Sequence, residues 1–85
     1  MLIRNWILEE VSGKHINFEA LCRELVSKAR KHKYTTSEME IRILLERLIK
    51  DRLVDTCQFL AEERKYSPTI YDERNIYWYW FKGSD

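Results

Sequence analysis

The stretch from Thr35 to Val54 constrains the fold of this chain more than any other. Its apolar residues recur at i, i+3, i+4, i+7 and i+8, which places them on one continuous stripe of an α-helix. These residues are Ile41, Leu44, Leu45, Leu48 and Ile49. Burial of each aliphatic side chain is worth roughly 1.5–3 kcal/mol before the entropy cost is counted. Because charged side chains occupy the other face, the rest of the chain must cover this stripe.

Two capping boxes of the type S/T-x-x-E fit the start of this helix. Thr35 pairs with Glu38 in one of them, and Ser37 pairs with Glu40 in the other. Both alternatives stay open, so the start of the helix, which we expect over about residues 37–51, is defined only to within a turn.

Two shorter amphipathic helices precede it, over about residues 2–12 and 18–31. Gly13 is suited to end the first helix, and Asn17 is suited to cap the second. The basic run 28–33 falls at the end of the second helix, where positive charge complements the helix dipole.

The spacing of apolar residues changes after the third helix from a helical period to an alternation typical of strands. We expect strands over about 53–58 and 75–81, the second being the aromatic run NIYWYWF. The polar segment 60–74, broken by Pro68, then forms a long tip between them. A short helix over 56–65 is an open alternative.

This order predicts an α+β fold, a winged helix in which a three-helix core is closed by a C-terminal β-hairpin wing. Eighty-five residues leave room for one core, so we expect a single domain over residues 1–85. An isolated two-stranded hairpin is not stable in water, so the wing must pack on the helices.

The aromatic strand presents alternate side chains to opposite faces. Either Trp78 and Trp80 or else Tyr77, Tyr79 and Phe81 cover the third helix, and the sequence leaves this choice open. The remaining set faces outward or is covered by the tip, for which the candidates are Tyr66, Ile70 and Tyr71. Since outward Trp and Tyr side chains are typical anchors of protein interfaces, the partner-contact candidates on this strand are Trp78, Trp80, Tyr77 and Tyr79.

The charge balance argues mildly against a dedicated nucleic-acid binder. Lys and Arg total 15 against 14 for Asp and Glu, a net charge of +1, whereas phosphate neutralisation normally needs a basic excess. A DNA-binding winged helix is still the alternative function, with the third helix in the major groove and the wing on the backbone or in the minor groove. Its candidate residues are Arg42, Arg47, Lys50, Arg64, Lys65 and Arg74.

The sequence contains no motif for catalysis, and we expect neither an enzyme nor a cofactor. Cys22 and Cys57 are far apart and do not form a C-x-x-C pair, so no metal site is expected either. Arg4 and two glutamates interrupt the apolar N-terminal residues, which argues against a signal peptide and a membrane span. We therefore expect an intracellular protein, cytoplasmic or nuclear.

The segment IRILLERLIKDRLVD, residues 41–55, resembles the last-helix signature of the winged-helix domain that closes cullins. The matching positions are Ile41, Leu45, Glu46, Leu48, Ile49, Val54 and Asp55, while Leu53 stands where the family prefers Tyr. The strand residues Tyr77 and Tyr79 resemble the family's Tyr-x-Tyr, and Lys14-His15 resembles a Lys-His between its first two helices. The resemblance implies a non-catalytic part of a ubiquitin-ligase scaffold that contacts a RING subunit or a conjugating enzyme.

Two features depart from that family. Cullins accept a ubiquitin-like modifier on a lysine of the first helix, but residues 4–10 contain none. Leu8 stands near the acceptor position, and Glu9 and Glu10 stand where positive charge is expected. Modification there is therefore not predicted, and Glu9 and Glu10 become candidates for partner contact. The connection 62–74 is also longer than the family's usual wing.

Overall fold

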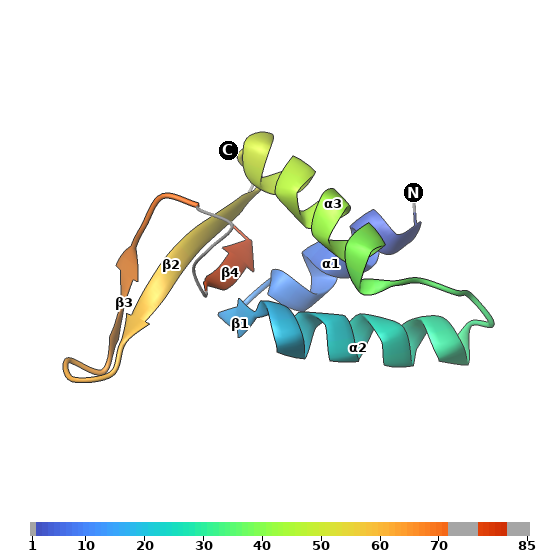
Figure 1. Cartoon of the computed structure of the whole chain (residues 1–85), viewed down its shortest axis with the longest axis horizontal. Coiled ribbons are helices and arrows are strands. Elements are labelled where there is room, and N and C mark those ends of the chain that lie inside the picture. The colour runs from blue at the N-terminus through green and yellow to red at the C-terminus, as the bar shows by residue number, and fades with distance from the viewer. Residues whose placement is uncertain (1, 72–76, 82–85) are drawn as a thin grey trace.

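Three helices and a four-stranded antiparallel sheet make up the described chain, residues 2–71 and 77–81 of a computed structural model (Figure 1). The elements in order are α1 (Leu2–Val11), β1 (Ile16–Asn17), α2 (Phe18–Lys31), α3 (Glu38–Lys50), β2 (Val54–Leu60), β3 (Lys65–Pro68) and β4 (Trp78–Phe81). The molecule is thus an α+β domain, with its helices gathered on one side of the sheet.

All three predicted helices are present, with ends that differ from the prediction by a residue at most. The start of α3 is set by Ser37, whose Oγ accepts a hydrogen bond from the Glu40 amide at 3.2 Å. The Glu40 carboxylate accepts a hydrogen bond from the Thr36 hydroxyl at 2.6 Å. The Ser37 alternative is therefore correct, although Glu40 bonds to Thr36 rather than closing the second half of the box.

Both α2 and α3 end in a Schellman motif built without glycine. Lys33 (φ 56°) follows α2 and Arg52 (φ 64°) follows α3, so both adopt the left-handed conformation. The amide of the next residue donates to the carbonyl five positions earlier, at 2.8 Å after α2 and 3.0 Å after α3. These bonds satisfy carbonyls that the helix end would otherwise leave open.

The sheet has the strand order β1-β4-β2-β3. The predicted pairing of the two C-terminal strands is confirmed, since β2 and β4 are antiparallel with Thr56 opposite Tyr79. The two-residue strand β1 was not predicted, because two residues are too short to show any alternation; it pairs with β4. The second predicted strand begins at Trp78, and residues 75–76 lie outside the described ranges.

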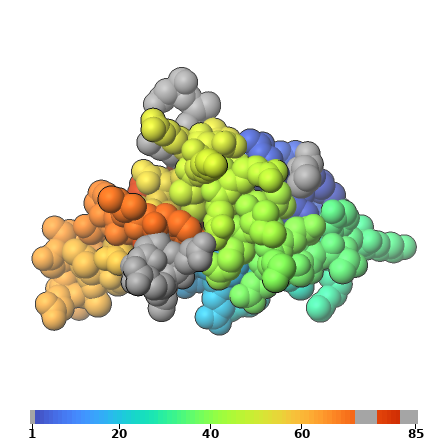
Figure 2. Space-filling view, turned by 45° about the horizontal axis from the view of Figure 1, so that its top comes forward, coloured from blue at the N-terminus to red at the C-terminus, as the bar shows by residue number. Residues whose placement is uncertain are grey.

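The predicted tip over 60–74 contains another strand, so that prediction is wrong in part. β2 continues to Leu60, and a turn with Arg64 at φ 52° brings β3 back along it. This excludes the alternative helix over 56–65. β3 lies at the edge of the sheet, where a proline at the strand end costs no ladder hydrogen bond, and this explains how Pro68 obscured it. In Figure 2 the hairpin of β2 and β3 projects from the body of the molecule.

The core forms between the helices and one face of the sheet. Four residues of the α3 stripe are buried and Ile49 is partly buried, together with residues of α1 and α2. Ile16 of β1 and Val54 of β2 contribute to this core, and so do Tyr77 and Tyr79 at 2% and 3% exposure, so the tyrosine set faces the helices. Large rings on this face fill the space above α3, and Trp78 and Trp80 consequently face the other way.

Candidate interaction surface

The outer face of the sheet, turned away from the helices, carries a cluster of aromatic side chains. The register places Phe59 opposite Tyr66 and Cys57 opposite Trp78, and directly opposed residues share a face. We call His15, Phe59, Tyr66, Trp78 and Trp80 the aromatic platform. Phe59 and Tyr66 are 43% and 38% exposed, His15 is exposed, and both tryptophans are partly buried.

The rings of the platform hold one another in place. His15 stacks on Tyr66 with ring centroids 4.0 Å apart and planes at 9°, and it also lies 5.1 Å from Trp80. Tyr66 meets Trp78 edge to face at 5.7 Å and lies 5.1 Å from Phe59. The platform therefore joins the segment before β1 to strands β2, β3 and β4 through contacts among its own rings.

Cys57 is the buried floor of the platform. It is 1% exposed, and its Sγ–H donates to the Trp78 carbonyl at 3.7 Å. Burial, followed by the charge of Asp55, raises the pKa of the Cys57 thiol. The thiol is thus protonated at neutral pH and acts as a small packing group rather than a nucleophile.

The opposite, helix-facing side is closed by a tyrosine network. The Tyr71 hydroxyl donates to the Glu46 carboxylate at 2.8 Å, and the Tyr77 hydroxyl donates to the Ile70 carbonyl at 2.9 Å. Burial and the bond to Glu46 raise the pKa of Tyr71 to about 12. Of the three residues considered as covers for the outward rings, Tyr66 does belong to the platform. Tyr71 packs on α3 instead, and Ile70 is exposed.

The partner-contact candidates are thereby separated. Tyr77 and Tyr79 are unavailable to a partner because they are buried against the helices, whereas Trp78 and Trp80 remain on the platform. Glu9 and Glu10 lie on α1 and are engaged in ion pairs, Glu9 with Lys28 at 2.6 Å and Glu10 with Lys14 at 3.3 Å. The paired lysines neutralise these two carboxylates, so the two glutamates do not form a negatively charged patch.

The basic candidates on α3 have different surroundings. Arg42 is partly buried, with its guanidinium 4.2 Å from the centre of the Phe18 ring. Arg47 and Lys50 are exposed in the last turn of α3. Arg42 is therefore a packing residue, and two exposed cations are left on this helix.

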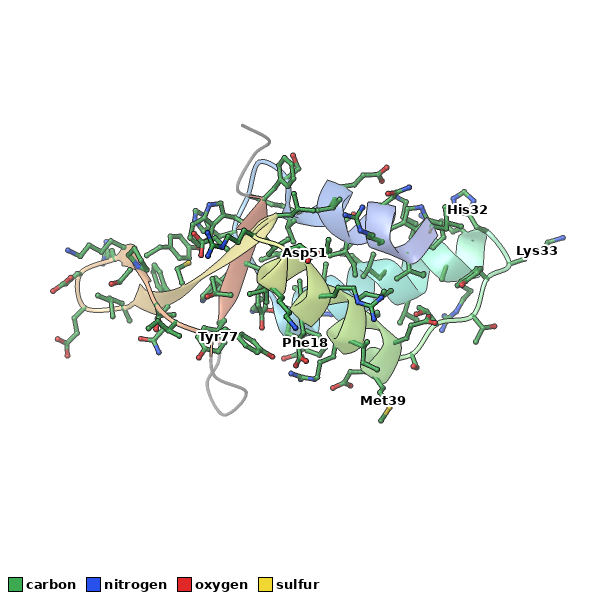
Figure 3. All side chains as sticks on the ribbon, turned by 90° about the horizontal axis from the view of Figure 1, so that it is seen from above. Phe18, His32, Lys33, Met39, Asp51 and Tyr77 are labelled. Atoms are coloured by element: carbon green, nitrogen blue, oxygen red, sulfur yellow. The ribbon has the colours of Figure 1, made fainter. Side chains whose placement is uncertain are left out.

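The basic candidates of the wing lie apart from those two. Arg64 and Lys65 are at the turn of the β2–β3 hairpin, which points away from α3 (Figure 1), and Lys65 pairs with Glu63 at 3.1 Å. Arg74 lies outside the described residues. The run 28–33 ends at the far end of the molecule from the sheet, where Figure 3 labels His32 and Lys33. The candidate cations of α3 and those of the hairpin therefore do not lie together.

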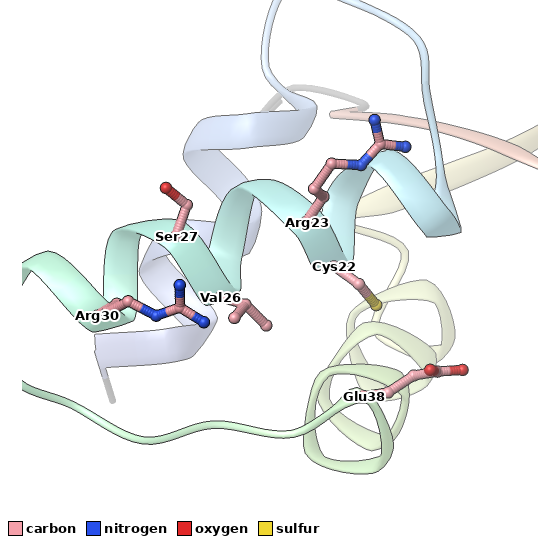
Figure 4. Close-up of a pocket in the computed structure, with 6 residues that line it drawn as sticks. All are labelled: Cys22, Arg23, Val26, Ser27, Arg30 and Glu38. Carbon is pink, nitrogen blue, oxygen red and sulfur yellow. The ribbon is translucent and has the colours of Figure 1, made fainter.

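An open groove of about 430 Å³ lies between α2 and the first turn of α3. Figure 4 shows Cys22 and Val26 directed toward α3, while Arg23 and Ser27 point to the other side of α2. Burial, and to a lesser extent Glu38, raises the pKa of Cys22 to about 11, so its thiol is protonated at neutral pH. Arg30 and Glu38 also line this groove, and the Arg30 guanidinium lies beside Val26 (Figure 4).

Over residues 2–71 and 77–81, no three His, Cys, Asp or Glu side chains are grouped so that they could bind a metal ion. In the same ranges, none of the helices has the length and hydrophobicity needed to span a bilayer. Comparison of the chain with protein-family models, curated proteins and solved structures gives no match.

Sequence reasoning found part of the platform and missed the rest. Trp78 and Trp80 stood out as a pair, whereas Phe59 lies beyond the predicted end of its strand at about residue 58 and was not among the candidates. His15 carried no local signal, because its stacking on Tyr66 depends on the pairing of β1 with β4 across sixty residues of sequence.

Proposed function

We propose that this chain is a non-catalytic protein-interaction domain of the winged-helix type and that the aromatic platform is its contact surface. One observation carries the proposal: aromatic side chains from three neighbouring strands gather on the sheet face that the helices leave uncovered. Trp, Tyr and Phe are enriched in the centres of protein interfaces, because a rigid ring buries a large area at low entropy cost.

The arrangement of elements supports the winged-helix part of the proposal. A short strand between α1 and α2 pairs with the last strand, and that strand pairs with the one that follows α3. The far end of the β2–β3 hairpin extends away from the helices, as a wing would (Figure 1). The added strand β3 accounts for the unusual length of the connection.

The resemblance of residues 41–55 to cullins supplies the wider proposal, an intracellular role in a ubiquitin-ligase scaffold. In that role the domain contacts a RING subunit or the conjugating enzyme that the subunit positions. Leu8, which stands near the acceptor position, packs against the core and carries no amine, as expected of a member of this kind that is not modified on α1.

A direct binding measurement tests this proposal. We expect a purified RING-type subunit with its conjugating enzyme to bind the domain in isothermal titration calorimetry. Trp78→Ala should weaken that binding about tenfold or more, since central aromatic anchors dominate such interfaces. Met39→Ala is the matched control, because Met39 is an exposed apolar residue on α3, away from the platform. Equal binding by both variants would contradict the proposal.

The alternative, a DNA-binding regulator, is favoured by the exposed Arg47 and Lys50 at the end of α3. A regulator would bind mixed-sequence duplex DNA, and its affinity would fall ~10³-fold or more between about 50 and 200 mM salt. We expect no such binding, because Arg47 and Lys50 lie apart from the cations of the hairpin and the net charge of the chain is only +1. Salt-dependent binding that is lost in an Arg47→Ala, Lys50→Ala double variant would establish the alternative instead.

A further inference from the structure

We infer that the outer face of α3 is a self-association surface, on which a second copy of this chain packs its own α3 in the antiparallel direction. The outer face consists of Met39, Glu40, Ile43, Arg47 and Lys50, all of them exposed. The inference goes beyond the proposed function, because it concerns a helix surface and not the aromatic platform. Three properties of this face carry it: its apolar side chains, the hollows beside them and the order of its charges.

The first property is a pair of apolar side chains that the other described elements leave uncovered. Met39 and Ile43 lie one helical turn apart, so they are neighbours on the same face. They are 73% and 52% exposed. In Figure 3 the Met39 side chain points away from the body of the molecule. Together the two side chains form a short apolar ridge along α3.

The second property is a hollow on each side of Met39. The first hollow, of about 380 Å³, is lined by Ser37, Met39, Glu40, Ile43 and Leu44. The second, of about 310 Å³, is lined by Glu38, Met39 and Arg42. Two helices pack by placing the ridges of one into the grooves of the other. An identical helix offers both the ridge and the hollow that this packing needs.

The third property is the order of the charges along α3. Its first turn carries Glu38 and Glu40, and its last turn carries Arg47 and Lys50. All four side chains are exposed, and none of them forms an ion pair with another residue of 2–71 or 77–81. The dipole of the helix favours this order, which is also complementary to itself when the direction of the helix is reversed.

The two remaining charged side chains of α3 leave that order unchanged. Glu46 accepts a hydrogen bond from the Tyr71 hydroxyl at 2.8 Å. The Arg42 guanidinium lies 4.2 Å from the centre of the Phe18 ring. Both are therefore engaged within the chain, and they add one charge of each sign.

An antiparallel second copy pairs the free charges by symmetry. Glu40 and Arg47 are two turns apart, so they lie on the same edge of the helix and about 10 Å apart along its axis. A two-fold axis near Ile43 brings Glu40 of each copy beside Arg47 of the other, and it sets the two Ile43 side chains against each other. A parallel pair would place like charges together. A uniformly acidic or basic partner would meet charge of its own sign at one end of the face.

Sedimentation equilibrium of the whole chain at low salt tests the inference. A contact between two single helices is small, and small interfaces belong to weak, transient complexes. We expect the average mass to rise from that of a monomer toward that of a dimer between about 10 μM and 1 mM chain. A monomer at every concentration would overturn the inference.

Charge reversals assign the dimer to α3. Glu40→Arg and Arg47→Glu should each weaken dimerisation about tenfold or more, because each places like charges together across the two-fold axis. The variant with both reversals should dimerise as the parent chain does, since the two charges have exchanged places. Lys31→Glu is the matched control. It makes the same change of charge in the last turn of α2 and should alter the dissociation constant less than about twofold.

A mixture of the two single variants provides a second measurement if the double variant does not fold. Glu40→Arg and Arg47→Glu chains in equal amounts should form a mixed dimer, because each brings the charge that the other lacks. A dimer that survives both single reversals would overturn the inference, and so would failure of both the double variant and the mixture to dimerise. A dimer that is lost in Trp78→Ala but kept in Arg47→Glu would place self-association on the platform instead.

Discussion

Lys33 and Arg52 occupy left-handed positions that usually belong to glycine. An L-residue in this conformation costs roughly 1–2 kcal/mol, and glycine avoids that cost while losing more chain entropy on folding. We expect Lys33→Gly and Arg52→Gly each to stabilise the domain by about 0.5–1 kcal/mol, which raises Tm by roughly 2–8 °C for a chain of this size. Differential scanning calorimetry measures the change.

Lys31→Gly is the matched control for the first of these variants. It lies in the last turn of α2 with right-handed backbone, so glycine should destabilise the domain there by about 1 kcal/mol. A loss of stability in Lys33→Gly similar to that in Lys31→Gly would contradict the Schellman assignment.

Tyr71 makes folding stability depend on alkaline pH. The fold raises its pKa from 10.0 to about 12, because burial and the Glu46 bond favour the neutral hydroxyl. A raised folded pKa contributes stability that is fully present below about pH 10 and is lost as the pH rises toward 12. We expect Tyr71→Phe to lower the free energy of unfolding by about 1 kcal/mol near pH 8, because the hydrogen bond to Glu46 is lost. Between pH 10 and 12 the free energy of unfolding of the variant should fall less than that of the parent chain.

Urea unfolding at several pH values checks this expectation. Burial also raises the pKa of Tyr79, so ionisation of Tyr79 contributes to the loss of stability at alkaline pH. The free energy of unfolding of Tyr71→Phe should therefore still fall with pH, but less steeply than that of the parent chain. An unchanged slope in the variant would show that Tyr71 is not buried against Glu46.

Residue-scale features were only partly predictable from the sequence. Asn17 as the cap of α2 was predictable, because its side chain is suited to accept the Ala20 amide that it binds at 2.8 Å. The start of α3 was not, since Thr35 and Ser37 present the same local pattern. The left-handed Lys33 and Arg52 gave no signal, because lysine and arginine are uncommon in that conformation.

At the scale of elements, α3 is the helix on which the core is assembled. Leu45 is 2% exposed within it, whereas Ile43 on the other face is 52% exposed. We expect Leu45→Ala to destabilise the domain by about 2–5 kcal/mol, because it removes methyl groups from a packed core and leaves a cavity. Ile43→Ala should stay within about 0.5–1 kcal/mol of the parent chain. Chemical denaturation of both variants gives the comparison. Equal losses of unfolding free energy in the two variants would contradict the assignment of Leu45 to the buried face of α3.

The helices were predictable as elements because their periodicity is local and strong. Strand β3 was not, because its four residues include Pro68 and its pairing with β2 depends on a turn that holds Arg64 in the left-handed conformation. The orientation of β4 was also beyond the sequence. A run of five aromatic residues supplies two faces of nearly equal hydrophobicity, and the packing of the sheet against the helices places Tyr77 and Tyr79 inward.

At the scale of the molecule, the two faces of β4 differ in their surroundings, since Tyr79 is buried against the helices while Trp78 and Trp80 are only partly buried. The inner face joins the three helices into one core, and the outer face carries rings that the core does not need. The site residues of β4 were foreseeable as a set from their composition. Their division between the faces depended on the sheet register, and the contribution of His15 depended on β1, so neither could be read from one segment of the chain.

The most direct measurement is the unfolding free energy of two variants in the same strand, Tyr79→Ala and Trp80→Ala. The inward face predicts a loss of about 3–5 kcal/mol for Tyr79→Ala, as for other buried aromatic residues. It predicts no more than about 1.5 kcal/mol for Trp80→Ala, which removes a partly buried ring from the platform. A larger loss for Trp80→Ala than for Tyr79→Ala would reverse the two faces and contradict this account.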